Sequence, residues 1–160
     1  MRRSDQYGSL LSPLLGRAMA YARSILRHRQ NAQDVVQQAA MRGLERFESY
    51  DPSRPFKGWW FAILRNCCID ALRTAKSAHT TSLEHDPPDE RVNDEERWTR
   101  FAAALDQLKP DYGEILRLKY FADQSYAEIA ETLNIPKGTV MSRLYLARKA
   151  LAERMSVEDA

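Results

Sequence analysis

The clearest structural signal in this chain comes from residues 125–148, which read SYAEIAETLNIPKGTVMSRLYLAR. Ser125 and Glu128 have the spacing of a capping box, which predicts that a helix begins just after Ser125. Asn134 would form the corner, and Pro136 suits the first position of a second helix, where its missing N–H costs nothing. The pattern predicts a helix-turn-helix, a motif whose second helix reads DNA.

The second helix of this motif has polar and basic side chains on its outward positions. Lys137 and Thr139, at the helix N-terminus, are candidates for phosphate contacts, and Ser142 and Tyr145 for base edges. Arg143 is either a DNA contact or a structural ion-pair partner. The DNA-binding set is Lys137, Thr139, Ser142, Arg143, Tyr145 and Arg148. The competing interpretation is an ordinary helical hairpin with a solvated basic face.

The rest of the chain also reads as helical. Its 160 residues include only six glycines, 44% are hydrophobic, and no run of alternating β-branched residues indicates a strand. Helical spacing predicts further helices over residues 8–30, from a cap at Asn31 onward, and over 56–75, 95–108 and 110–121. We predict an all-α fold of two small helical domains, residues 8–76 and 95–155, joined by a flexible acidic linker at 77–94.

Charge is distributed unevenly along the chain. Residues 1–76 hold 13 Lys and Arg against 6 Asp and Glu, whereas residues 77–97 hold 2 against 7. A net charge of +7 makes the first part a candidate partner for a polyanion, although a solvated basic surface without a ligand is the alternative. Adjacent Cys67 and Cys68 suit no structural disulfide, and we expect reduced thiols with at least one in the core.

Several classes of function find no support in the sequence. The histidines and cysteines show no metal-ligand spacing, and no phosphate-cradling glycine loop or nucleophile–base set is present. We therefore expect no metal, no cofactor and no enzymatic activity. The longest apolar run, residues 59–64, is far below the roughly 20 residues of a membrane span, so we expect a cytoplasmic protein.

Three stretches in this order resemble the extracytoplasmic-function (ECF) sigma factors of the sigma-70 family. Residues 31–42, NAQDVVQQAAMR, look like the segment that docks on the clamp of the largest RNA polymerase subunit. Residues 56–73, FKGWWFAILRNCCIDALR, are similar to the helix that reads and melts the −10 element. Residues 105–151 look like the −35-binding domain.

The resemblance implies site residues in the first domain. For −10 binding and melting they are Arg54, Phe56, Lys57, Trp59, Arg65, Asn66 and Arg73. Aromatic faces, an amide and nearby cations are what a protein needs to hold bases out of the stack. Trp59 has a competing role in the core, and the loop at 49–55 either captures a flipped base or is a plain turn.

The polymerase-binding residues implied by the resemblance are Asp34, Gln37, Gln38 and Arg42. Gln38 departs from the family, which commonly has an acidic residue there, so clamp binding should be weaker. Met141 and Leu146 stand where relatives often carry basic side chains, which should reduce base discrimination.

The implied function is a sigma factor that binds core RNA polymerase and directs promoter-specific initiation by recognising −35 and −10 elements and melting DNA. An anti-sigma factor is a further expected partner. One alternative is a sigma-like mimic that sequesters an anti-sigma factor without binding DNA; the net charge of residues 1–76 and the retained Asn66 oppose it. Another is a dimeric helix-turn-helix regulator, which leaves the first 76 residues unexplained.

Overall fold

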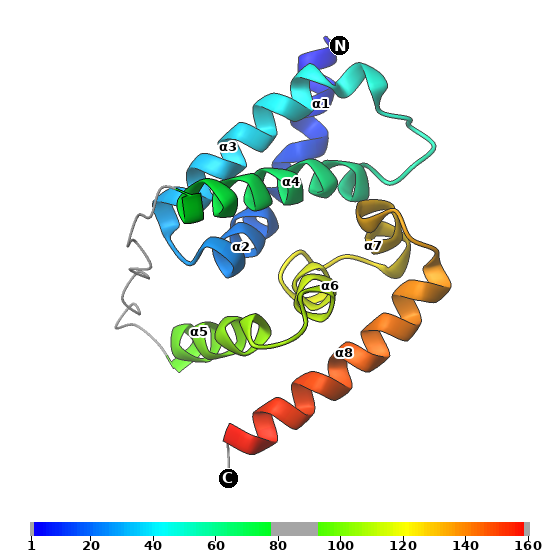
Figure 1. Ribbon diagram of the computed structural model, residues 1–160. Helices are drawn as coiled ribbons and strands as arrows, with labels where there is room; N and C mark the ends of the chain where they lie inside the picture. Colours follow the sequence, from blue (N-terminus) through cyan, green and yellow to red (C-terminus); the bar gives the residue numbers. More distant parts are fainter. Residues whose placement is uncertain (1, 78–92, 159–160) are drawn as a thin grey trace.

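The described part of the protein is built from α-helices. The computed structural model describes residues 2–77 and 93–158 (Figure 1), and within them no strand occurs, which confirms the all-α prediction. The helices are α1 (Arg3–Leu11), α2 (Leu15–Leu26), α3 (Arg29–Glu45), α4 (Phe56–Ser77), α5 (Asn93–Asp106), α6 (Pro110–Tyr120), α7 (Tyr126–Leu133) and α8 (Lys137–Glu158), with 3-10 turns at Ser12–Leu14 and Phe47–Ser49.

The first half packs α2, α3 and α4 together, with α1 against α3. The single helix predicted over residues 8–30 is wrong, because a 3-10 turn that contains Pro13 separates α1 from α2. Proline removes a backbone donor, which favours such a break. The predicted cap at Asn31 is also wrong. Arg27 adopts a left-handed φ of 60° that ends α2, and the side chain of His28 caps α3 by accepting from the Asn31 N–H.

The second half ends in the predicted helix-turn-helix. The Ser125 and Glu128 side chains form both bonds of the capping box, and α7 begins at the next residue as expected. Asn134 forms the corner with a φ of 53°, a conformation that asparagine tolerates better than most residues. Pro136 lies just before α8, not in its first position, and its carbonyl accepts from the Val140 N–H.

The two halves pack against each other. Helix α7 packs against the beginning of α4 (Figure 1), and α2 contacts both α5 and α6, so buried side chains of both halves form one continuous core. The predicted flexible linker falls mainly on residues 78–92, outside the described residues. Helix α4 continues through residue 77 and α5 begins at residue 93.

Candidate nucleic-acid interface

The outward face of α8 presents most of the predicted −35 residues to solvent. Lys137, Ser142, Tyr145 and Arg148 are exposed, and Thr139 is half-buried. The inward positions at Val140, Leu144 and Ala147 are fully buried. Because these apolar positions recur at helical spacing, packing fixes which face of α8 is available to DNA.

Arg148 is held in place by a residue that the sequence analysis did not include. Its Nε donates to the Tyr120 hydroxyl at 3.0 Å, and its guanidinium lies 5.9 Å from the centre of that ring. The hydrogen bond to Tyr120 raises the pKa of Arg148. Tyr120 is itself 45% exposed.

Arg143 is half-buried on α8 and has no hydrogen bond or ion pair to any residue that the structure describes. This arrangement does not support the structural ion-pair role that the sequence left open. Ser142 donates instead to the Thr139 carbonyl at 3.2 Å. Met141 and Leu146, where the family often has basic residues, are 54% and 47% exposed. They therefore place apolar surface on this face.

Asn66 and Arg73 are the exposed members of the predicted −10 set on α4. Together with Trp59 they recur at intervals of seven residues, which brings all three side chains to nearly the same side of a helix. Trp59 is half-buried at the beginning of this row. The sequence therefore places an amide, a cation and an indole edge along one line.

The aromatic residues near the start of α4 form a cluster with each other. The Phe56 ring packs edge-on against Tyr50 at 5.4 Å and against Tyr7 at 6.0 Å, and Trp59 lies 5.1 Å from Tyr50. Phe56 is 9% exposed. The Phe56 ring is therefore packed among other aromatic side chains in this structure, and its role in −10 binding stays a prediction.

The loop before α4 is ordered by its own side chains. Asp51 accepts from the backbone and the hydroxyl of Ser53 at 2.9 and 2.8 Å, and these bonds lower the pKa of Asp51. The Tyr50 hydroxyl donates to the Arg54 carbonyl at 2.6 Å. The loop is therefore preorganised, which suits a rigid rim beside a nucleic-acid site.

Three predicted phosphate contacts are paired with residues of the second half. Arg54 binds Glu131 at 3.2 Å, the Lys57 ammonium donates to the Asp123 carbonyl at 2.6 Å, and Arg65 pairs with Glu114. Sequence reasoning did not identify these acceptors. Each cation and its acceptor are 49 to 77 positions apart in the sequence, and no local sequence pattern predicts contacts over such separations.

The four residues predicted to bind polymerase lie on α3 and differ in exposure. Asp34, Gln37 and Gln38 are exposed on α3, one turn apart. Arg42 is half-buried, and its guanidinium turns toward α4, 3.4 Å from the Cys67 sulfur and 3.8 Å from the Asp70 carboxylate. Met41, 65% exposed, lies nearer the row and was not predicted.

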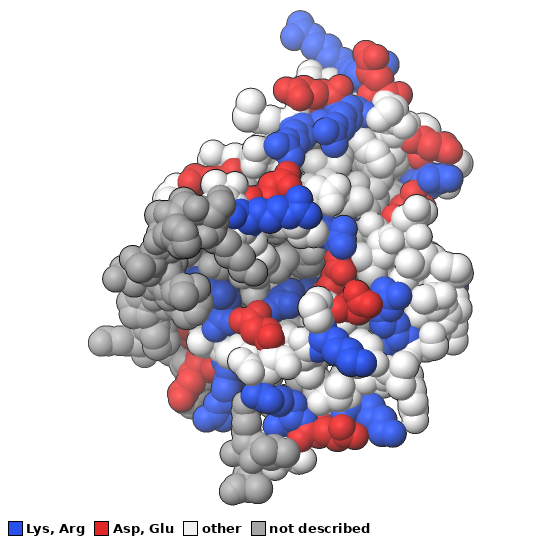
Figure 2. Space-filling view, viewed as in Figure 1, with Lys and Arg blue, Asp and Glu red and all other residues white. Residues whose placement is uncertain are grey.

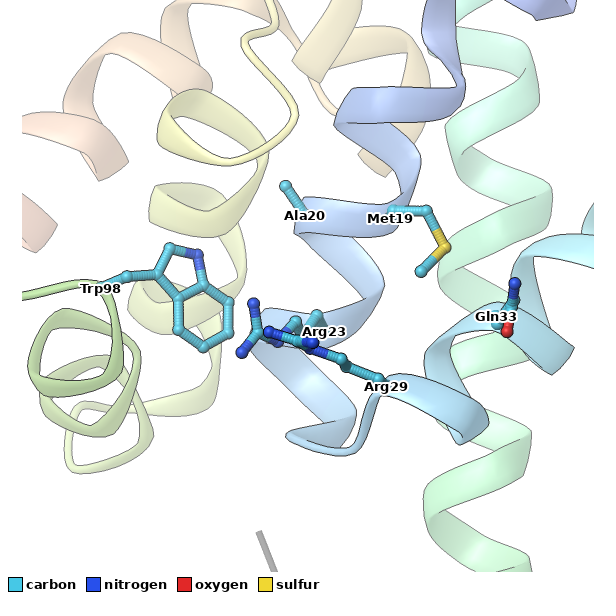
Figure 3. A pocket seen from close by; sticks show the side chains of 6 residues that line it. All are labelled: Met19, Ala20, Arg23, Arg29, Gln33 and Trp98. Carbon is cyan, nitrogen blue, oxygen red and sulfur yellow. The ribbon is translucent and has the colours of Figure 1, made fainter. Parts of the chain in front are cut away.

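A cavity of about 350 Å³ opens where α2 and α3 meet α5. In Figure 3 the Arg23 guanidinium stands beside the Trp98 indole, and the two are 4.5 Å apart from Cζ to ring centre. Arg27 pairs with Asp106 at 3.1 Å nearby. These groups join the halves and leave a partly apolar recess between them.

Both cysteines are free and fully buried, which confirms the expectation for the thiols. Burial raises the pKa of Cys68 to about 12 and also raises that of Cys67. Across residues 2–77 and 93–158, no helix has the length and apolar character needed to cross a membrane.

Charges of both signs are mixed on one face of the molecule. Figure 2 shows acidic side chains next to basic ones over both halves on this face, with no uninterrupted basic patch. The positive net charge of residues 1–76 is therefore partly neutralised by neighbouring carboxylates, several of which belong to the second half.

Comparisons with known proteins agree with this two-part arrangement. The chain matches the family described as Sigma-70 region 2 over residues 10–78 and the family described as Sigma-70, region 4 over residues 99–151. It is 34% identical over 147 residues to the ECF RNA polymerase sigma factor SigL of Mycobacterium tuberculosis, which covers 87% of this chain and 81% of that protein. It is 29% identical over 140 residues to the ECF RNA polymerase sigma factor SigW of Bacillus subtilis, covering 78% of this chain and 75% of SigW.

The fold is also similar to solved structures. One is described as a co-crystal structure of the sigma factor RpoE in complex with the anti-sigma factor NepR from Bartonella quintana. Its TM-score is 0.74 at 25% identity, over 95% of this chain and 98% of that chain. A structure of CnrH in complex with the cytosolic domain of CnrY has the same fold, with a TM-score of 0.74 at 24% identity over 94% of this chain and 88% of that one.

Proposed function

Because the chain belongs to the extracytoplasmic-function sigma factors of the sigma-70 family, we propose that its two halves divide the promoter between them. A sigma factor binds core RNA polymerase and directs transcription initiation at promoters, and this is the function of the chain. Residues 8–76 would dock on the polymerase and read and melt the −10 element. Residues 95–155 would read the −35 element. Neither half would carry out covalent chemistry.

The observation that carries the −10 role is the row of side chains on α4. Asn66 is an exposed amide that can both donate to and accept from a base edge. Arg73 lies two turns further on the same side, where it can bind the phosphate backbone. The ordered loop at 49–55 stands before the N-terminus of α4 and supplies a rim for a displaced base.

The −35 role is supported by the exposed face of α8. Lys137 is exposed at the N-terminal end of α8, where backbone N–H groups also attract phosphate. Tyr145 is 68% exposed, and its hydroxyl is available for a base edge. Met141 and Leu146 supply no donor, and each bidentate base contact that is missing forfeits about 1–3 kcal/mol of discrimination.

Core RNA polymerase is the partner of α3 in this proposal. Asp34, Gln37 and Gln38 form its exposed polar row, and they would bind the clamp of the largest subunit. We also propose that this chain binds an anti-sigma factor, because the similar structure of RpoE is a complex with the anti-sigma factor NepR. A protein that acts on the chromosome works where DNA and polymerase are, so we place it in the cytoplasm.

A sigma-like mimic is not favoured. The relatives that match over most of their length are named RNA polymerase sigma factors, and both family regions match in order. The exposed Asn66 and Arg73 are also groups that a pure protein decoy does not need.

Run-off transcription with purified core polymerase on genomic promoter fragments tests the proposal. The wild-type protein should yield discrete transcripts, and Asn66→Ala should reduce open-complex formation far more than polymerase binding. Gln6→Ala, which removes an exposed amide on α1, is the matched control and should behave as wild type. Equal loss of polymerase binding and promoter opening in Asn66→Ala would contradict base reading by this residue.

A further inference from the structure

Three large apolar side chains are exposed close together on α8, which runs along the edge of the molecule (Figure 1). Met141, Tyr145 and Leu146 are 54%, 68% and 47% exposed. None of the three packs against the hydrophobic core formed by the described residues. The fold therefore leaves them in water, and a partner that covers their apolar surface would be bound more tightly for that reason.

Helical geometry places Met141 and Leu146 on either side of the α8 surface that would face DNA. The two residues are five positions apart, a separation that turns the helix by about 140° and advances it by about 7.5 Å. Ser142 and Tyr145, both exposed, lie between them around the helix. An advance of about 7.5 Å corresponds to roughly two base-pair steps of about 3.4 Å, so the two side chains can reach different base pairs.

This surface offers few free hydrogen-bond donors to base edges. Met141 and Leu146 carry none, and the Ser142 hydroxyl donates to the Thr139 carbonyl at 3.2 Å. An apolar side chain that covers the amino group of cytosine or the carbonyl of guanine takes that group out of water without replacing its hydrogen bond, which is unfavourable. Thymine, in contrast, presents an apolar group in the major groove, its C5 methyl. At the positions that these two side chains reach, the surface therefore fits thymine best.

We propose that Met141 and Leu146 are specificity-determining residues of the −35 contact, and that each reads a thymine through its C5 methyl group. The inference rests on the −35 role proposed above for α8. Reading by apolar contact takes the place here of the hydrogen bonds that basic side chains would make. Burying one methyl group favours binding about fourfold, which is less than a bidentate pair of hydrogen bonds supplies.

Replacement of thymine by uracil in a promoter tests the inference, because deoxyuridine lacks the C5 methyl group of thymidine and keeps the O4 acceptor. The probe is a promoter fragment that yields a discrete transcript in the run-off assay. Each thymine of either strand within about ten base pairs around −35 is replaced in turn. Binding of the holoenzyme, formed by the full chain and core polymerase, is measured by fluorescence anisotropy. Two of the replacements should each weaken wild-type binding about fourfold.

Alanine variants assign each methyl group to its side chain. Met141→Ala should lose the uracil effect at one position and Leu146→Ala at the other, because the protein side of the contact is already missing. Leu10→Ala is the matched control: it truncates a side chain that is 41% exposed on α1, and it should keep both effects. All three substitutions change exposed side chains, so they should leave the fold intact.

The outcomes separate this inference from the proposed function. Thymine reading by these residues is overturned if no uracil replacement weakens binding while the fragment is still transcribed. It is equally overturned if the uracil effects are the same in Met141→Ala and Leu146→Ala as in Leu10→Ala. In both cases the proposed function stands. A holoenzyme that yields no discrete transcript from any genomic promoter fragment would overturn both.

Discussion

Gly43→Ala should destabilise the protein, although alanine is the better helix former. Gly43 is buried on α3 where this helix packs on α4. A Cβ there would meet the Tyr7 hydroxyl and would lie 2.9 Å from both Cδ1 and Nε1 of Trp60. The Tyr7 hydroxyl accepts from Trp60 Nε1 at 2.9 Å and donates to the Ala40 carbonyl at 2.7 Å, so the added methyl displaces a buried, fully bonded group.

The expected magnitude follows from three contributions. Replacing glycine by alanine inside a helix stabilises it by about 0.8–1 kcal/mol. Overpacking costs about 1–3 kcal/mol, and an unpaired buried donor costs about 1–3 kcal/mol more. We expect a net loss of about 3 kcal/mol, which corresponds to a decrease in Tm of roughly 6–12 °C for a chain of this size.

Urea and thermal denaturation followed by far-ultraviolet circular dichroism measure this loss. Gly16→Ala is the control and should be as stable as the wild type or slightly more stable, because its Cβ meets open space. Adding Tyr7→Phe to Gly43→Ala should recover part of the loss, since it removes the hydroxyl that the methyl meets. A Gly43→Ala protein that is as stable as Gly16→Ala would refute the reasoning.

Three further predictions concern DNA, polymerase and pH. Arg143→Ala should weaken −35 duplex binding and reduce the slope of log affinity against log salt by about 0.9, measured by fluorescence anisotropy; an unchanged slope would remove Arg143 from the phosphate contacts. Gln38→Glu, which adds a negative charge, should strengthen binding to core polymerase in a titration, and Asp34→Ala, which removes one, should weaken it. A change of affinity in the same direction in both variants would contradict a role for negative charge. Because burial raises the pKa of folded Cys68 to about 12, the protein should lose stability as the pH rises above about 9, where the unfolded thiol ionises. Urea denaturation at several pH values should show a flatter alkaline decline for Cys68→Ala, and an identical decline would show that other groups cause it.

Local patterns in the sequence were sufficient for the helix-turn-helix. The capping box, the asparagine corner and the apolar spacing of α8 depend on residues at most a few positions apart, so each can be recognised in the sequence before the structure is known. Burial of at least one cysteine was expected in the same way from the helical pattern, and the structure buries both. Asn66 was identified through the resemblance to sigma factors. Small errors occurred where a backbone conformation decided the outcome, as at Arg27, whose left-handed φ moved the start of α3.

What the sequence determined by itself is the set of helices, their amphipathic faces and the resemblance to a sigma factor, because these depend on short-range spacing and on recognisable motifs. Only the tertiary structure decided which side chains remain free to act. Phe56 is withdrawn into an aromatic cluster, Arg42 turns toward α4, and Arg54 and Arg65 are paired with carboxylates of the other half. The physical reason is that ring packing and ion pairing join residues far apart in the chain, and their geometry exists only once the helices have packed.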